Sequence, residues 1–198
     1  VKTGEAARTS RVKYDTLGRF PISTTNNLGH TSRAEFDEVS GAITKRIDPN
    51  GLSQIVRYDS LQRVRQETDA TGVVTKTETE FFGSYELAFT VTKTVGTLPP
   101  TVSAHDAAGR PRWQSSIGFE GKAVIVEFGY DALGRLVRST IPRFKGDQAR
   151  ATVRRYDELD RQIEESRPDG VILSTRYEGL KTIAIDPLKR ETVIEKNA

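Results

Sequence analysis

Residues 130–135 read Tyr-Asp-Ala-Leu-Gly-Arg, and this stretch decides the fold. The flanking residues 123–130 and 135–141 are rich in β-branched and aromatic side chains, which is typical of β-strands. Asp131 can accept hydrogen bonds from backbone amides two residues further on, and Gly134 can adopt a positive φ at little steric cost. The stretch therefore predicts a hairpin corner, in which a type I turn is followed by a left-handed glycine and a G1 bulge.

The same signature returns along the chain. Residues 14–19 repeat it in full, and residues 105–110 repeat it with histidine in place of tyrosine. Residues 58–63 and 156–161 replace the glycine with Gln62 and Asp160, and weaker echoes lie at 36–41 and 177–180. The repeat positions to which we assign a structural role are Tyr14, Asp15, Gly18, Arg19, Tyr58, Asp59, Arg63, Asp106, Gly109, Arg110, Tyr130, Asp131, Gly134, Arg135, Tyr156, Asp157 and Arg161. Recurrence at a fixed period indicates one supersecondary unit stacked many times.

A second class of corner lies between the first. Residues 48–51 and 167–170 combine proline, aspartate and glycine, and residues 69–72 combine aspartate and glycine; all three residue types favour tight turns. Corners near every tenth or eleventh residue leave strands of five to eight residues, and the full unit is close to 22 residues, as from Tyr14 to Phe36. This spacing predicts an all-β fold, a repetitive antiparallel strand–turn–strand array. Residues 73–104 break the rhythm and are interpreted as longer strands or a degenerate repeat, and residues 142–148 as a longer loop.

Composition excludes several classes of protein. The apolar fraction is 35%, and charged residues make up 29%, which indicates thin sheets with much solvated surface. The pI is about 9.2, but 30 cations are mixed with 27 anions, so no basic patch for nucleic acid stands out. The absence of cysteine excludes a disulfide framework and a thiolate metal site. No apolar run approaches the ~18–20 residues of a membrane span.

The chain has no methionine, so we expect a segment of a longer polypeptide, residues 1–198 forming a single repeat array. Such a segment would carry sheet edges that normally pair with neighbouring repeats. We therefore expect self-association, or pairing with flanking repeats of the parent protein.

The corners resemble those of the YD-repeat, or Rhs, family. The resemblance is strongest at 14–19 and 130–135, and it covers most of the chain. The family includes Rhs polymorphic toxins, the B and C components of insecticidal toxin complexes, and teneurins. The resemblance implies a strand-rich sheet that spirals into a hollow shell, part of whose curved wall this chain would form, and which in bacterial members encloses a toxic C-terminal segment. It also implies a secreted or cell-surface location. The self-cleaving aspartyl protease segment of bacterial members has no convincing match, because the Asp-Pro pairs at 48–49 and 186–187 fit the ordinary turn rhythm.

Each repeated residue type also has a structural interpretation. The tyrosines could stack on sugars or bases, but they can equally pack sheet against neighbouring sheet. The aspartates could act as general acids and bases, but each lies where a carboxylate bonds turn amides. The arginines could bind an anion, or pair with a nearby carboxylate and cover apolar surface. His30 and His105 lack metal-ligating partners, and Trp113 is a packing position.

The sequence thus predicts a non-catalytic segment of an Rhs-type shell that encloses a toxin or C-terminal effector. Its partners would be flanking repeats and the enclosed segment, with no cofactor, metal or nucleic acid. The alternative is an extracellular adhesion module that binds a carbohydrate or protein through its tyrosine-bearing strands. A third possibility, an enzyme, would need carboxylates that converge in a cleft.

Overall fold

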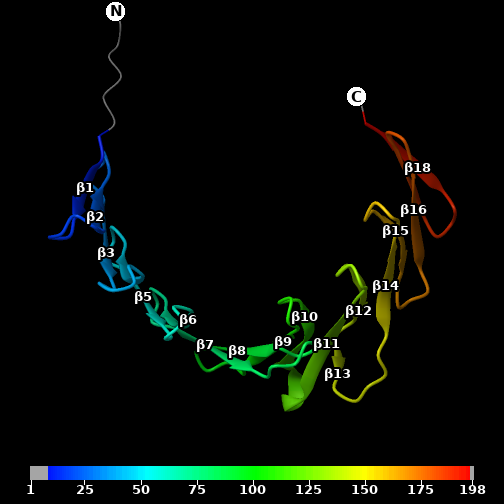
Figure 1. Cartoon of the computed structure of the whole chain (residues 1–198), viewed down its shortest axis with the longest axis horizontal. Helices are drawn as coiled ribbons and strands as arrows, with labels where there is room; N and C mark the ends of the chain where they lie inside the picture. The colour runs from blue at the N-terminus through cyan, green and yellow to red at the C-terminus, as the bar shows by residue number, and fades with distance from the viewer. Residues whose placement is uncertain (1–8, 197–198) are drawn as a thin grey trace, which may run out of the picture. The chain divides into compact units, whose positions relative to one another are not determined.

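The computed structural model describes residues 9–196, in which eighteen β-strands follow one another (Figure 1). The chain divides into two compact units. Unit 1 comprises residues 1–78 and 92–100, and unit 2 comprises residues 79–91 and 101–198. Among the residues described, the one helical segment is a three-residue 3-10 turn, η1 (Phe119–Gly121). The all-β fold predicted from the corners is confirmed.

Unit 1 is a meander in which each strand pairs antiparallel with the next. Its strands are β1 (Arg11–Tyr14), β2 (Pro21–Thr25), β3 (Thr31–Phe36), β4 (Ile43–Ile47), β5 (Ser53–Tyr58), β6 (Val64–Thr68) and the first part of β7 (Val74–Phe81). These strands alternate with the two predicted classes of corner, except between β2 and β3. There an unpredicted corner is led by Asn26, whose Oδ1 accepts from the N–H groups of Leu28 and His30. The rhythm of aspartate-led turns therefore sets the strand lengths.

Unit 2 continues the same pattern. Its strands are the first part of β8 (Phe89–Val95), then β9 (Thr101–His105), β10 (Pro111–Ile117), β11 (Ala123–Tyr130), β12 (Leu136–Thr140), β13 (Arg143–Phe144), β14 (Ala151–Tyr156), β15 (Gln162–Ser166), β16 (Ile172–Glu178), β17 (Lys181–Ile185) and β18 (Glu191–Glu195). From β9 to β18 the strand pairing is antiparallel, and β12 pairs with β14 because β13 folds back onto β11. The prediction that residues 142–148 are only a loop was incomplete, since they contain β13.

The repeat corners shift the strand register at a constant place. The shift falls next to the repeat aromatic, for example between Arg57 and Tyr58 and between Gly129 and Tyr130. Gly134 has a φ of 83°, and Gln62 and Asp160 take up the same left-handed conformation at 60° and 61°. The extra left-handed residue supplies the bulge that the sequence predicts, and it increases the local twist of the pair.

The sheets are thin. Among the described residues only Ala104, Ile183, Asp106 and Thr140 are buried, and most strand residues are half-buried or exposed. Without a thick apolar core, stability must come from strand pairing and from local side-chain contacts. Residues 73–104, which interrupt the repeat rhythm, contain the long strands β7 and β8, as one of the two interpretations predicts.

Within residues 9–196, no helix is long and apolar enough to cross a membrane.

Candidate functional site

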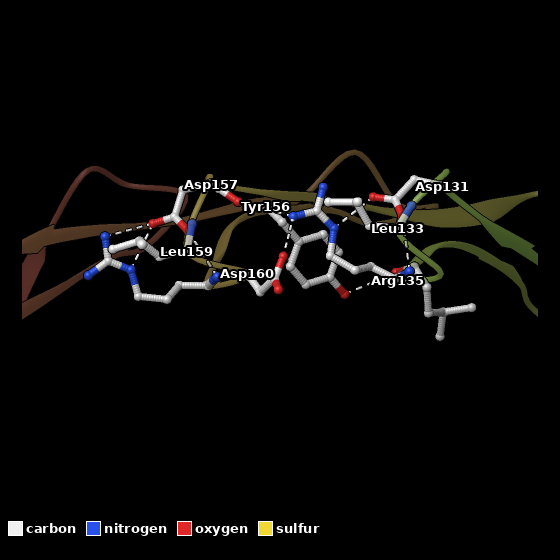
Figure 2. A network of polar contacts seen from close by, with 9 residues as sticks. Asp131, Leu133, Arg135, Tyr156, Asp157, Leu159 and Asp160 are labelled. Atoms are coloured by element: carbon white, nitrogen blue, oxygen red, sulfur yellow. Dashed lines mark hydrogen bonds and ion pairs between the residues drawn. The ribbon is translucent and has the colours of Figure 1, made fainter.

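The corner at Asp131 shows what the repeat signature does. The Asp131 N–H donates to the Arg135 carbonyl at 3.1 Å, and the Gly134 N–H donates to the Asp131 carbonyl at 3.0 Å. The carboxylate Oδ1 of Asp131 accepts from the N–H groups of Leu133 and Arg135 at 3.0 and 2.9 Å. Its Oδ2 accepts from Arg135 Nε at 2.7 Å (Figure 2). One carboxylate therefore satisfies two turn amides and anchors the arginine four residues later.

The other predicted corners share this aspartate–arginine pair. Oδ2 of the aspartate lies 2.6–3.3 Å from the guanidinium of the arginine four residues on. The pairs are Asp15–Arg19, Asp59–Arg63, Asp106–Arg110 and Asp157–Arg161. The structure thus decides between the alternatives for these arginines: each pairs with a carboxylate of its own corner.

A further corner has an aspartate–arginine pair that was not predicted, although residues 186–187 were assigned to the turn rhythm. Asp186 accepts from the N–H groups of Leu188 and Arg190, and Arg190 Nε lies 2.5 Å from Asp186 Oδ2. Lys189 replaces the glycine and has a φ of 62°. The signal that could have found it is an arginine four residues after the aspartate. The echo at 177–180 is different, since Glu178 lies opposite Lys181 across a two-residue turn and pairs with Arg176.

Successive repeats in unit 2 are tied together by the same arginine. Arg135 Nη1 donates to the carbonyl of Asp157 at 3.1 Å and to Asp160 Oδ1 at 2.7 Å (Figure 2). Its guanidinium carbon lies 5.1 Å from the centre of the Tyr156 ring, within the range of a cation–π interaction. The Tyr156 hydroxyl donates to the Leu136 carbonyl at 3.0 Å, immediately after Arg135. We call this arginine–tyrosine contact the clamp.

The clamp recurs along unit 2. Arg110 lies 4.9 Å from the Tyr130 ring, and the Tyr130 hydroxyl donates to the Pro111 carbonyl at 3.0 Å. Arg161 lies 4.3 Å from the ring of Tyr177, whose hydroxyl donates to the Gln162 carbonyl at 3.1 Å. The tyrosines therefore connect consecutive repeats of one sheet. The interpretation that they pack sheet against neighbouring sheet was wrong for these three.

Unit 1 replaces part of the clamp with stacked aromatic rings. Arg19 lies 4.9 Å from the centre of the Phe20 ring, and Phe20 stacks on Phe36 at 5.0 Å. Phe36 has no hydroxyl, but Tyr58 in the following repeat donates to the Ile43 carbonyl at 2.9 Å. Tyr14, at the first corner, is half exposed. The hydroxyl contact is thus present at Tyr58 even though the corner before it, at 36–41, lacks the arginine.

His105 takes the place of a repeat tyrosine in unit 2, as predicted. Its ring stacks on Phe89 with centroids 4.8 Å apart, Nδ1 lies 3.1 Å from the Gly109 carbonyl, and Nε2 lies 3.0 Å from Ser103 Oγ. Both ring nitrogens are engaged within the fold. Residues 9–196 contain no group of three or more histidine, aspartate or glutamate residues placed to hold a metal ion.

The corner contacts favour the ionised carboxylates. At Asp131, desolvation raises the pKa, but hydrogen bonds from the backbone and guanidinium of Arg135 outweigh it and hold the pKa below its ordinary value. At Asp59 the backbone N–H of Arg63 is the largest cause of a lowered pKa. The pKa is also lowered at Asp15, Asp37, Asp69, Asp106, Asp157 and Asp186. A general acid would need the opposite shift.

We expect the fold to lose stability in acid. A carboxyl group whose pKa is depressed in the folded state stabilises the protein above its unfolded pKa, and this stabilisation is lost as the pH falls through the folded pKa. The corners should therefore be fully effective from pH 7 to 5 and weaken progressively below about pH 4. Urea midpoints measured from pH 7 to pH 2 test this.

Asp131→Asn provides the control for the acid series. The variant should be less stable than the wild type at pH 7 and approach it near pH 2, where the wild-type carboxyl is protonated as well. A wild-type midpoint that stays constant from pH 5 to 2 would contradict the role of the corner carboxylates.

These contacts leave the repeated residues little freedom for other chemistry. The corner aspartates bond their own turns, and the clamped tyrosines have an arginine on the ring and a hydroxyl donated to backbone. An adhesion surface built on Tyr130 or Tyr156 would have to break the clamp first. What the arrangement can do is hold successive hairpins in a fixed register.

Comparison with solved structures identifies the fold. The structure of TcdB2-TccC3 aligns with a TM-score of 0.74 at 14% identity, covering 94% of this chain and 13% of the other. The chain has the fold of the matched part of TcdB2-TccC3. TcdB2-TccC3 without its hypervariable C-terminal region gives a TM-score of 0.73 at 11% identity, covering 94% of this chain and 16% of that one. The predicted resemblance to toxin-complex B and C components is thus confirmed at the level of the fold.

The likeness is restricted in two ways. This chain spans only 13 to 16% of the length of the TcdB2-TccC3 chains that it matches. No protein-family model and no curated protein sequence matches it.

Proposed function

We propose that this chain is a non-catalytic segment of the wall of an Rhs-type shell. The wall would enclose a toxin or other C-terminal effector segment, and the chain's partners would be that segment and the flanking repeats of its parent protein. The proposal includes a single repeat array over residues 1–198 and an exported bacterial parent. The observation that carries it is the fold of TcdB2-TccC3 over 94% of the chain.

The clamp supplies a physical reason for such a role. A wall must span a large area with few residues, so each sheet can be only one layer thick and cannot depend on a deep core. In unit 2, Arg110, Arg135 and Arg161 each join a corner to the tyrosine of the following repeat. Repeated bulges add twist at regular intervals, which is how a sheet acquires curvature. Because each contact joins only neighbouring repeats, the same contact can recur along an array with any number of repeats.

Limited proteolysis of the full-length parent polypeptide tests the proposal. The segment C-terminal to the repeats should resist a protease that digests the same segment when it is expressed alone. The double variant Arg135→Ala/Arg161→Ala removes two clamps and should expose the enclosed segment to digestion. Arg155→Ala is the matched control, because Arg155 is exposed and its contact with Glu164 is long, at 3.8 Å.

Digestion of the segment at the same rate inside the wild-type parent and alone would overturn the enclosure role. Circular dichroism of each variant distinguishes an opened wall, which keeps its strand signal, from a chain that has not folded.

A further inference from the structure

One corner of unit 1 has no arginine to form a clamp. The N–H of Asp37 closes this corner on the carbonyl of Ala42 at 2.8 Å, as the N–H of Asp131 closes its own corner on the carbonyl of Arg135. Ala42 therefore occupies the position of the clamp arginine. Its methyl group is too short to reach the ring of Tyr58 in the following repeat.

Tyr58 nevertheless has the position of a clamped tyrosine. Its hydroxyl donates at 2.9 Å to the carbonyl of Ile43, the residue directly after Ala42. The hydroxyl of Tyr156 donates in the same way to the residue directly after Arg135. Within residues 9–196, however, no cation and no other aromatic ring stacks on the Tyr58 ring. The ring is thus held in place for a guanidinium that Ala42 does not supply.

A hollow of about 500 Å³ lies beside this ring, which is a volume typical of small-ligand sites. Its lining includes Asp37, Tyr58, Asp59 and Gln62. These residues correspond to the groups that hold the Arg135 guanidinium in unit 2. Those groups are the corner carboxylate, the tyrosine ring, the carbonyl of the next corner aspartate and the side chain of the left-handed residue.

Two acceptors of the hollow have no donor among residues 9–196. Oδ1 of Asp37 accepts from the N–H and the hydroxyl of Ser40 at 2.7 and 2.8 Å, but Oδ2, the oxygen that binds arginine at the complete corners, has no such bond. The side-chain amide of Gln62 also makes no hydrogen bond there, and its φ of 60° matches that of Asp160. Hydrogen bonds from the backbone and hydroxyl of Ser40 hold the pKa of Asp37 below its ordinary value, so the carboxylate is charged at neutral pH.

The other charges of the lining do not fill this place. Lys45 pairs with Glu35 at 3.3 Å, and Asp59 pairs with Arg63 at 2.6 Å. Arg57 is exposed and forms no ion pair with another described residue, and a charge exposed to solvent is screened. The corner carboxylate of the hollow is therefore left without a cation in the described part of the chain.

We propose that this hollow binds an alkylguanidinium group, such as the end of an arginine side chain. The group would stack on the Tyr58 ring, donate to Asp37 Oδ2 and reach the Asp59 carbonyl and the Gln62 amide oxygen. A guanidinium suits these acceptors because its five N–H donors lie in one plane, whereas an ammonium is a compact point charge. The corresponding groups already hold a guanidinium in unit 2 (Figure 2). The inference does not depend on the proposed shell function.

A titration followed by NMR of the tyrosine rings tests the site. N-acetylarginine amide, which presents the side chain as a peptide does, should shift the Tyr58 ring signals saturably. The rings of Tyr130 and Tyr156 already carry an arginine, so their signals should stay unchanged and serve as internal controls. N-acetyllysine amide should bind more weakly, because an ammonium lacks the planar fork of donors.

Free arginine distinguishes the two sources of the group. Tighter binding of free arginine than of the blocked derivative would assign the hollow to the amino acid. Equal or weaker binding would assign it to an arginine within a polypeptide.

Three variants test the geometry. Ala42→Arg supplies the guanidinium from the chain itself and should abolish binding of N-acetylarginine amide. Asp37→Asn keeps an oxygen for the turn amides and should weaken binding about tenfold, the equivalent of ~1.4 kcal/mol for a charge-assisted hydrogen bond. Arg135→Ala is the converse change, and it should make the Tyr156 ring respond to the same probe.

Absence of a saturable shift at Tyr58 would overturn the proposal. Equal binding of the lysine derivative, or unchanged binding by Ala42→Arg, would overturn it as well. Circular dichroism of each variant shows whether it is folded, and Asp37→Asn and Arg135→Ala keep the test decisive if Ala42→Arg does not fold.

Discussion

Replacing Asp106 with alanine is expected to lower the free energy of unfolding by about 2–4 kcal/mol. This is slightly less than the roughly 3–5 kcal/mol for removing one partner of a fully buried ion pair, because the Arg110 side chain is 26% exposed. Asp106 is 1% exposed. Its Oδ1 accepts from the N–H groups of Ala108 and Arg110 at 3.0 and 2.9 Å, and its Oδ2 lies 2.8 Å from Arg110 Nη2. Alanine leaves two turn amides and a guanidinium without their acceptor. Urea unfolding followed by circular dichroism measures the loss.

Two further variants separate the contributions of the turn hydrogen bonds, of the ion pair with the arginine and of burial. Asp106→Asn retains an oxygen for the turn amides but offers no second oxygen to the arginine, so its loss should be intermediate. Asp186→Ala removes the same set of contacts from a corner whose Arg190 is 76% exposed, and water can replace them there. Asp106→Ala should therefore be clearly more damaging than Asp186→Ala. Equal losses would mean that burial does not control how much a corner contributes to the free energy of unfolding.

The corners themselves could be predicted because all their information is local. An aspartate, two spacers and a residue that tolerates a positive φ define the turn, and the strands fill the space between turns. The turn at Asp186 was recognised but not as a corner of the repeat signature, and the reason is local as well. It lacks the preceding tyrosine and carries Lys189 in the left-handed position, where glycine is favoured.

The clamp could not be predicted because its partners are distant in the sequence. Arg135 and Tyr156 are 21 residues apart, and they meet only after β12 and β14 have paired around the β13 excursion. Periodicity alone shows that a tyrosine recurs, and it does not show whether the ring faces another sheet or the previous corner. The register of the strands decides this, through the bulge that each corner introduces.

The clamp leads to the second large prediction, at Tyr130. Tyr130→Ala is expected to destabilise the fold by about 2–4 kcal/mol, because a half-buried ring is lost together with its hydrogen bond. Tyr130→Phe keeps the ring under Arg110 and removes only the hydroxyl bond to the Pro111 carbonyl, so it should cost about 1 kcal/mol. Burial, followed by the charge of Asp106, raises the pKa of Tyr130 above 10.0, which keeps the hydroxyl protonated as a donor.

Tyr14→Phe is the matched control for the hydroxyl, because Tyr14 is 51% exposed and its hydroxyl has no hydrogen-bond partner among residues 9–196. It should leave the urea midpoint unchanged.

Tyr130→Ala also distinguishes the shell-wall role from the alternative of an adhesion module. If Tyr130 is a structural residue of the wall, Tyr130→Ala lowers the stability of the protein. If Tyr130 is a binding residue, the variant loses affinity for a glycan or protein while the fold keeps its full stability. Saturable ligand binding that disappears in Tyr130→Ala without a change in midpoint would therefore contradict the clamp, since the ring would then be free to act on the outside of the sheet.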